Sequence, residues 1–195
     1  MLSHKESLNI LRKTNALLEG HFVLSSGLHS PKYVQCAKLL SFPNKANKIC
    51  KSLSSKIKKN FKNVNLILSP AVGGIIIGYE IGKLLNLETI FCERVNKKFK
   101  LRRGFSIKKN ARVVIVEDVV TTGKSSLECV NLIKKAKAKI LGFACIIDRS
   151  NKKNLKIKKK VISHLKINIP TYKKSQLPPS LKSTPISVPG SRFIK

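Results

Sequence analysis

Apolar and polar positions in the first sixty residues predict two helices separated by a hairpin. A capping box at Ser3–Glu6 precedes apolar residues spaced as on a helix face, which predicts a helix over residues 3–19. Residues 21–36 hold two extended runs around a short polar turn, a pattern typical of a β-hairpin. A proline suited to a first helical turn then opens an amphipathic, lysine-rich helix predicted over residues 43–60.

From residue 64 onward, short and continuous apolar runs alternate with helical patterns. Continuous apolar runs are typical of strands that are buried on both faces of a parallel sheet. We therefore predict an α/β fold with a central, mostly parallel sheet flanked by helices. The predicted strands cover residues 64–68, 88–92, 112–116, 139–147 and 161–169, and the helices between them cover 73–85 and 123–137.

Length and composition fit a single domain that spans residues 1–195, with 42% apolar residues and no internal repeat. The first residues lack the pattern of a signal peptide, and the apolar runs are too short to cross a bilayer. The five cysteines are odd in number and widely spaced, which predicts reduced, buried thiols without a disulfide framework or a zinc site. We expect a cytoplasmic protein with no membrane partner.

The charge balance is extreme, with 40 basic and 9 acidic residues and a formal net charge of +31. Such a charge suggests RNA, DNA or acidic lipid as partners. However, most of the basic residues are scattered lysines, as a genome biased toward A and T also produces. We therefore predict no specific nucleic-acid partner, although the surface should attract small polyanions.

The tail after Asp148 contains no acidic residue, and five prolines interrupt it. We expect a last strand followed by a segment that packs on the domain. A disordered arm that binds nucleic acid is the competing interpretation.

The segment 113–126 carries the clearest chemistry. It consists of a buried apolar strand, the adjacent acids Glu117 and Asp118, a short loop rich in Thr, Gly and Ser, and the start of a helix. Open parallel sheets bind ligands beyond the carboxyl ends of their strands. Backbone N–H groups and hydroxyls at a helix N-terminus suit a phosphate, and two carboxylates can accept from vicinal sugar hydroxyls or help to hold magnesium. The same acids could alternatively cap the following helix.

This segment resembles the signature of type I phosphoribosyltransferases, whose substrate is 5-phosphoribosyl 1-pyrophosphate. The resemblance implies that the acids lie along the ribose and that the loop binds the 5'-phosphate. It implies binding of the ribose 5-phosphate by Glu117, Asp118, Thr121, Thr122, Gly123, Lys124 and Ser125.

Two further segments resemble the orotate-specific members of that family. Residues 22–33 match the segment that lines the base pocket, which implies that Tyr33 stacks on the pyrimidine. At the end of a later strand, Arg149 matches the arginine that binds the orotate carboxylate, a role that suits a planar guanidinium. The residues implied for orotate binding are Ser26, Tyr33, Thr121 and Arg149.

Two loops complete the resemblance. The small-residue loop Ala71, Val72, Gly73 and Gly74 resembles the pyrophosphate loop, whose backbone N–H groups bind an anion. The basic stretch 93–105 resembles the mobile catalytic loop, which in the family closes over the neighbouring subunit's site and so implies a homodimer. The catalytic residues implied are Arg94, Lys98, Lys100, Arg102, Arg103 and Asp118.

Taken together, the resemblance implies a type I phosphoribosyltransferase fold with a small N-terminal hood, formed by residues 1–40 and part of the C-terminal segment. The expected reaction transfers ribose 5-phosphate to N1 of orotate, with Mg²⁺ carried by the substrate near Asp118 and no direct protein metal site. A purine or uracil phosphoribosyltransferase and a non-catalytic regulator on this fold are the alternatives. The chain departs from the family at Ser25 and near Gly73, where relatives often carry lysine, and its catalytic loop lacks the usual histidine.

Overall fold

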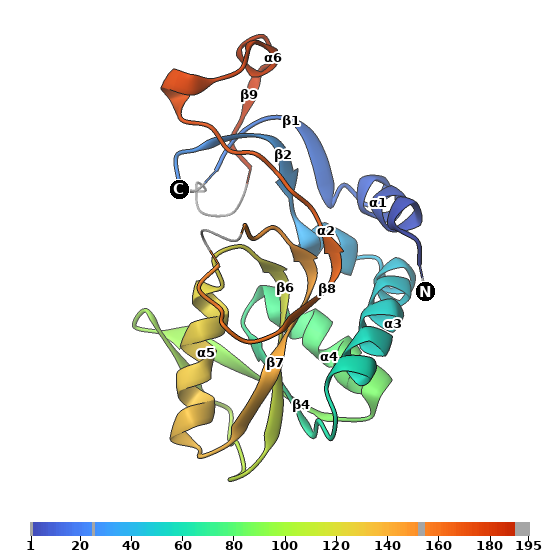
Figure 1. The fold of residues 1–195 in the computed structure, drawn as a ribbon, viewed down its shortest axis with the longest axis vertical. Coiled ribbons are helices and arrows are strands. Elements are labelled where there is room, and N and C mark those ends of the chain that lie inside the picture. Colours follow the sequence, from blue (N-terminus) through green and yellow to red (C-terminus); the bar gives the residue numbers. More distant parts are fainter. Residues whose placement is uncertain (1, 25, 152–154, 190–195) are drawn as a thin grey trace.

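The computed structural model describes residues 2–24, 26–151 and 155–189 and contains a main domain beneath a smaller sheet (Figure 1). The main sheet has six strands in the order β5-β4-β3-β6-β7-β8, and all neighbouring strands are parallel except β4 and β5. The predicted α/β architecture with a mostly parallel sheet is therefore confirmed. The strands are β3 Leu66–Pro70, β4 Glu88–Val95, β5 Lys98–Leu101, β6 Arg112–Val120, β7 Lys139–Asp148 and β8 Val161–Lys166.

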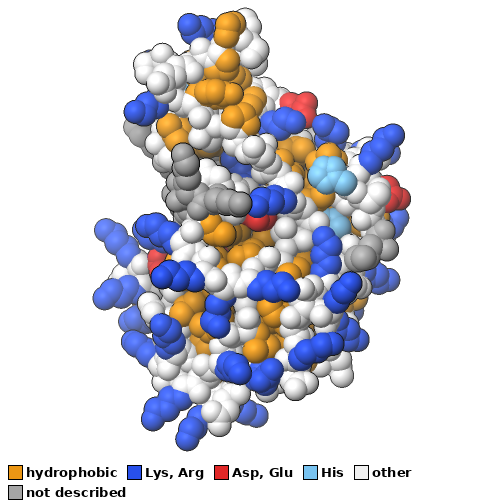
Figure 2. Space-filling model, viewed as in Figure 1, with side chains coloured by type: hydrophobic (Ala, Val, Ile, Leu, Met, Phe, Trp, Pro, Cys, Tyr) orange, Lys and Arg blue, Asp and Glu red, His pale blue; other side chains and the backbone are white. Residues whose placement is uncertain are grey.

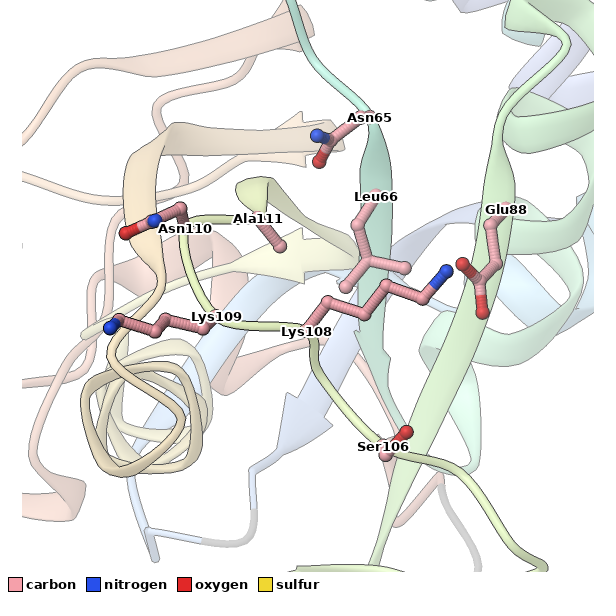
Figure 3. Close-up of a pocket in the computed structure, with 8 residues that line it drawn as sticks. All are labelled: Asn65, Leu66, Glu88, Ser106, Lys108, Lys109, Asn110 and Ala111. Carbon is pink, nitrogen blue, oxygen red and sulfur yellow. The ribbon is translucent and has the colours of Figure 1, made fainter.

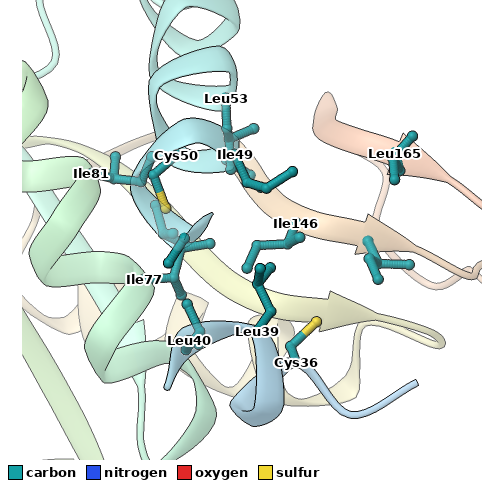
Figure 4. Close-up of a cluster of buried hydrophobic side chains, with 14 of the residues drawn as sticks. Cys36, Leu39, Leu40, Ile49, Cys50, Leu53, Ile77, Ile81, Ile146 and Leu165 are labelled. Carbon is teal, nitrogen blue, oxygen red and sulfur yellow. The ribbon is translucent and has the colours of Figure 1, made fainter. Parts of the chain in front are cut away.

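Helices cover both faces of this sheet. The helices α3 (Pro43–Asn60) and α4 (Gly73–Leu85) lie on one face and α5 (Lys124–Lys135) lies on the other (Figure 1). Consecutive residues of β6 point alternately to the two sides, so that Val114 packs in the cluster under α3 and α4 whereas Val113 packs in the cluster under α5. Figure 4 shows the first cluster, where side chains of α3 and α4 meet Ile146 of β7. Burial on both faces explains the continuous apolar runs in the sequence.

The first helix is shorter than predicted. The capping box forms, since the Ser3 amide donates to the Glu6 carboxylate (2.8 Å) and the Glu6 amide donates to the Ser3 hydroxyl (3.2 Å). However, α1 covers only His4–Lys13, and the expected helix to residue 19 is wrong. Ala16 and Leu18 keep a helical spacing, but the Ala16 carbonyl instead accepts from the Gln35 amide. The chain thus turns into a strand before the apolar pattern ends.

The smaller sheet is the hood. It contains β1 (Leu17–Val23), β2 (His29–Val34) and β9 (Ile186–Ser187), with β1 in the centre. The hairpin of β1 and β2 was predicted, whereas the parallel pairing of the C-terminal β9 with β1 was not. Between the two sheets the chain passes through α2 (Cys36–Leu40), which was also not predicted.

The C-terminal segment packs on the hood. It contains η1 (Lys174–Gln176) and α6 (Pro179–Lys182), and Leu181 of α6 is buried. The Tyr172 and His29 backbones exchange two hydrogen bonds of 2.9 Å, and the His21 and His29 rings share one of 2.6 Å. Both ends of the chain therefore build the hood.

Lysines and arginines are spread over the face of the molecule seen in Figure 2, with few acids between them. This dispersed arrangement agrees with the scattered lysines of the sequence. Over the described ranges, no helix combines the length and the apolar character needed to span a bilayer.

Candidate active site

The acid pair lies near the carboxyl end of β6. Glu117 is buried and accepts a hydrogen bond from the Ser126 hydroxyl at the start of α5. Burial raises the pKa of Glu117 to about 7, against the opposing effect of Ser126, and the neighbouring Asp118 raises it further. Burial also raises the pKa of Asp118, whose carboxylate accepts from the Val119 amide (2.9 Å). Each acid thus accepts a hydrogen bond, and Glu117 is buried whereas Asp118 is half-buried.

The loop after β6 leads directly into α5. Gly123 has φ 74°, in the left-handed region that glycine favours, and a β-carbon there would lie 2.6 Å from the Ile157 side chain. The side chains of Thr121, Thr122 and Lys124 are exposed around it. Because α5 has no side-chain cap, backbone N–H groups and hydroxyls remain available to an anion at this end of the helix.

A second loop reaches the acid pair from β3. It runs from Ala71, whose amide donates to the Cys92 carbonyl of β4 (2.8 Å), to Gly73 at the start of α4. A β-carbon on Gly73 would lie 2.8 Å from the Asp118 carboxylate, so the loop backbone packs directly against this acid. A side chain at this position would have to displace the Asp118 carboxylate.

Arg149 follows β7 at the same edge of the sheet, and its amide donates to the Val120 carbonyl (2.8 Å). Burial lowers the pKa of its guanidinium, while Tyr33 and Cys36 act on it in the opposite direction. The Arg149 Nε atom is buried without a hydrogen-bond partner among the described residues. A desolvated, incompletely bonded guanidinium is an unusual feature and matches a site for an anionic ligand.

The hood contributes Tyr33, whose ring lies 5.9 Å from that of Phe22. Its link to the main domain runs through Cys36, where the thiol lies 3.8 Å from the Asp118 carbonyl. Ser26 is exposed in the hairpin turn, where its hydroxyl accepts weakly from the Leu28 amide (3.4 Å). Ser25 lies outside the described residues. Tyr33 thus lies three residues before the Cys36 contact with β6 and acts electrostatically on Arg149, whereas Ser26 is bonded within its own turn.

The basic segment 93–105 was expected to be a loop between strands, but it forms a hairpin from the end of β4 and all of β5. We call residues 93–105 the lid hairpin. In it Arg94 donates to Glu128 of α5 (2.7 Å) and to the Lys97 carbonyl (2.6 Å), and its guanidinium lies 4.1 Å from the Phe99 ring centre. Arg94 thus anchors the hairpin to α5. The ammonium-bearing side chains of Lys98 and Lys100 are exposed.

The two arginines at the end of the lid hairpin are engaged with one acid. Arg103 donates to Glu93 through Nε (2.9 Å) and Nη2 (2.7 Å), and Arg102 Nη1 lies 3.6 Å from the same carboxylate. Both arginine side chains are largely exposed, whereas only 18% of the Glu93 side chain is exposed.

A separate hollow of about 390 Å³ lies at the opposite end of the sheet, where β3 and β4 begin (Figure 3). Its lining includes Leu66, Glu88 and Lys108, and the Lys108 side chain extends toward Glu88. Because ligands of open parallel sheets bind at the carboxyl ends of the strands, this hollow does not belong to the candidate active site.

Comparison with known proteins identifies the family to which this arrangement belongs. The phosphoribosyl transferase domain family matches residues 40–183. Orotate phosphoribosyltransferases from Phenylobacterium zucineum (44% identical, covering all of both chains) and Parvibaculum lavamentivorans (45% identical, covering 99% of this chain and all of the other) are similar over the full length. The chain belongs to the orotate phosphoribosyltransferases.

Solved structures agree at the level of the fold. An orotate phosphoribosyltransferase from Aeropyrum pernix has a TM-score of 0.70 at 21% identity, covering 82% of this chain and 92% of the other. An adenine phosphoribosyltransferase from Thermoanaerobacter pseudethanolicus has a TM-score of 0.60 at 17% identity, covering 70% and 88%. The type I phosphoribosyltransferase fold predicted from the sequence is therefore confirmed.

The structure brings most of the predicted site residues of this orotate phosphoribosyltransferase to one edge of the sheet. Ser126, which was expected to donate its hydroxyl in this loop, donates it to Glu117. The structure also adds Glu93 and Glu128, which were not predicted as site residues and which bind the lid arginines. One signal for the lid was present in the sequence, since residues 98–101 alternate basic and apolar side chains as strand β5 does.

Proposed function

We propose that the carboxyl edge of the main sheet transfers the ribosyl group of phosphoribosyl pyrophosphate to N1 of orotate. The products are orotidine 5'-monophosphate and pyrophosphate, a glycosyltransferase step of pyrimidine biosynthesis. The observation that best supports orotate as the base is Arg149, whose buried Nε has no hydrogen-bond partner among the described residues and whose pKa is influenced by Tyr33. A carboxylate would supply that partner through two parallel hydrogen bonds, and Tyr33 would stack on the pyrimidine.

The acid pair and the following loop are proposed to hold the ribose 5-phosphate. Glu117 and Asp118 would accept hydrogen bonds from the two ribose hydroxyls, and the 5'-phosphate would bind over the N-terminus of α5. Support for this comes from the left-handed Gly123, the exposed Thr121 and Thr122 hydroxyls and the uncapped first turn of α5. Lys124 and Ser125 would add a charge and a hydroxyl, and Thr121 would also reach the orotate ring.

The pyrophosphate is proposed to bind at the loop Ala71–Gly74, through backbone N–H groups. The contact between the Gly73 backbone and the Asp118 carboxylate supports this arrangement, because it brings the ribose and pyrophosphate sites together. The same carboxylate oxygen fits a hard cation such as Mg²⁺ carried by the substrate. In this proposal the other ligands of the ion come from the substrate.

Catalysis in this proposal depends on position and electrostatics. As the bond to pyrophosphate breaks, positive charge develops on the sugar ring and negative charge on the leaving group. Bound Mg²⁺ would neutralise part of the leaving-group charge. Arg149 and Tyr33 would hold N1 of orotate in line with the departing group, and Lys98, Lys100, Arg102 and Arg103 would add donors around the pyrophosphate and exclude water. Arg94, which anchors the lid hairpin to α5, would act together with these four residues. No residue needs to act as a nucleophile.

The enzyme is proposed to act as a homodimer that exchanges lid hairpins. An exposed apolar stripe formed by α4 and the residue before it supports a subunit interface beside the pyrophosphate loop, since Val72, Ile76 and Tyr79 are 83%, 54% and 67% exposed. Their spacing places them on one face of the helix. Replacing Ile76 and Tyr79 by Asp should give monomers in sedimentation analysis and abolish turnover, and an active monomer would contradict lid exchange.

The proposed location is the cytoplasm, with no membrane or specific nucleic-acid partner. The five cysteines support it, because all are buried and none is in a disulfide, although Cys92 and Cys129 lie 3.3 Å apart.

The direct test measures the loss of orotate absorbance with purified protein, phosphoribosyl pyrophosphate and Mg²⁺. Turnover that is lost in Arg149→Ala, and in the triple variant Lys100→Ala/Arg102→Ala/Arg103→Ala, is the expected result. Turnover of adenine, hypoxanthine or uracil without turnover of orotate would overturn the proposed base. No turnover with any base, from folded protein, would instead favour a regulator built on this fold.

A further inference from the structure

The end of the lid hairpin folds into a tight turn that carries its two arginines. The Phe105 amide donates to the Arg102 carbonyl (2.9 Å), and both central residues have positive φ, 58° for Arg103 and 73° for Gly104. Two positive φ values are typical of a type I′ turn, in which a long side chain such as that of Arg103 is disfavoured at the first central position. The ring of Phe105 packs edge-on against that of Phe91 (5.1 Å), which fixes the turn to β4. This conformation therefore needs a compensating contact at Arg103.

Glu93 supplies that contact. Its Oε1 accepts both hydrogen bonds from Arg103, at 2.7 and 2.9 Å. Its Oε2 faces Arg102 Nη1 at 3.6 Å and accepts no hydrogen bond within the described part of the chain. One carboxylate thus lies between two guanidinium groups, and the pairing is strong at Arg103 and loose at Arg102.

Glu93 also lies close to the proposed pyrophosphate site. It follows Cys92, whose carbonyl accepts from the Ala71 amide of the pyrophosphate loop, and it is paired across the hairpin with Lys100. Only 9 residues of the whole chain are acidic, so a carboxylate among three lid cations is not a product of composition. An acid beside a site for a polyanion opposes binding unless it serves another purpose.

We propose that Glu93 is a positioning residue that holds Arg102 and Arg103 on the open lid hairpin until the polyphosphate of the substrate replaces it. A guanidinium edge that is paired with Glu93 cannot bind phosphate at the same time, so lid closure requires this ion pair to break. Pyrophosphate is the stronger competitor because it carries more charge. After product release, Glu93 pairs again with Arg102 and Arg103, and the lid hairpin returns to its open conformation. The inference rests on the proposed role of the lid arginines.

Loss of this ion pair should leave the guanidinium groups of Arg102 and Arg103 free to bind phosphate before substrate arrives. For an ion pair between a mostly buried acid and exposed arginines, Glu93→Gln should lower KM for phosphoribosyl pyrophosphate by about threefold. Glu93→Asp keeps the charge and should remain near the wild-type value. KM for orotate should change little, since Arg149 and Tyr33 do not contact the pair.

The experiment first establishes orotate turnover by the wild type, so that failure of the proposed function is recognised separately. It then measures kcat and KM for Glu93→Gln, Glu93→Asp and two controls. Glu88→Gln removes the same charge from the other end of β4, and Glu128→Gln removes the anchor of Arg94 but not the Arg103 contact. In the Arg103→Gln background, which keeps Arg102 and Lys100 on the lid hairpin, Glu93→Gln should change KM much less than it does in the wild type.

Limited proteolysis without substrate distinguishes release of Arg102 and Arg103 from a general loosening of the lid hairpin. An arginine-specific protease should cleave after Arg102 or Arg103 faster in Glu93→Gln than in Glu128→Gln, with cleavage sites assigned by mass spectrometry. An unchanged or raised KM in Glu93→Gln, or equal cleavage rates in the two variants, would overturn the proposal.

Discussion

Replacing Arg149 by Met should separate activity from stability in this enzyme. Methionine keeps the unbranched stem and removes only the guanidinium. If that group binds the orotate carboxylate through two charge-assisted hydrogen bonds, its loss costs ~2–4 kcal/mol of transition-state binding. The value of kcat/KM for orotate should then fall by about 30- to 700-fold.

The same substitution should not destabilise the fold. The Arg149 Nε is already buried without a hydrogen bond in the described part of the protein, and burial already lowers the pKa of the guanidinium. Removing a desolvated donor should leave the free energy of unfolding unchanged or raise it by up to ~1 kcal/mol. For a chain of this length that corresponds to a rise in Tm of about 2–4 °C.

Arg112→Met is the matched control. Arg112 lies at the start of β6, where its Nε and Nη2 donate to the Asn63 and Lys62 carbonyls, each at 2.9 Å. Its replacement should cost about 1–2 kcal/mol of stability and leave orotate turnover intact. Urea unfolding and steady-state kinetics on both variants test the reasoning. A loss of stability in Arg149→Met equal to that in Arg112→Met would refute it, because Arg149 would then be a structural residue.

Three further predictions follow from the site and its surroundings. Because burial raises the pKa of Glu117 to about 7, kcat/KM for phosphoribosyl pyrophosphate should fall as pH decreases below 7, where the protonated acid is a poor acceptor of hydrogen bonds from the sugar hydroxyls. The decrease at low pH should be absent from the pH profile of Glu117→Gln. Burial lowers the pKa of His164 to about 4, so the stability that its neutral form contributes is complete above pH 6.5 and is lost as pH falls from 6.5 to 4, by roughly 3 kcal/mol at most. In urea titrations over this range, the free energy of unfolding should decline less steeply for His164→Gln than for the wild type. Parallel declines would contradict the lowered pKa of His164. Gly123→Ala should destabilise the protein by about 1–2 kcal/mol and raise KM for phosphoribosyl pyrophosphate, because its β-carbon meets Ile157 at 2.6 Å. Gly27→Ala is the control, because Gly27 has a similar φ of 77° and open space around it. If both variants lose the same free energy of unfolding, the contact with Ile157 does not contribute to the loss.

Elements whose stability is decided locally were predictable from the sequence. The capping box placed the start of α1, and continuous apolar runs placed the strands of the main sheet, because both faces of that sheet are covered by helices. The end of α1 was not predictable in this way. Ala16 continues a helical pattern, yet its carbonyl bonds the Gln35 amide, a contact that depends on the hairpin nineteen residues away. Tertiary pairing thus overrides local periodicity.

The site residues divide in the same way into those that the local sequence reveals and those that only the fold brings together. Glu117, Asp118 and the loop that follows are adjacent in sequence, so a motif reveals them together. The acidic partners of the lid arginines are nine or more residues away from them, and the pairing of β4 with β5 brings Glu93 to Arg103. Because the chain has few acidic residues, each one draws attention in the sequence, but the composition does not show which arginine each acid binds.

The hood has a consequence for the order in which this protein becomes functional during synthesis. Its central strand β1 is among the first parts to leave the ribosome, but its partner β9, which pairs His21 with Ile186, is made near the end. The main sheet with the acid pair can assemble earlier, since β8 ends at Lys166. A nascent chain would thus complete the sheet that carries the proposed sugar-phosphate site before the hood is finished, and chains terminated before Ile186 would lack the strand that completes the hood sheet.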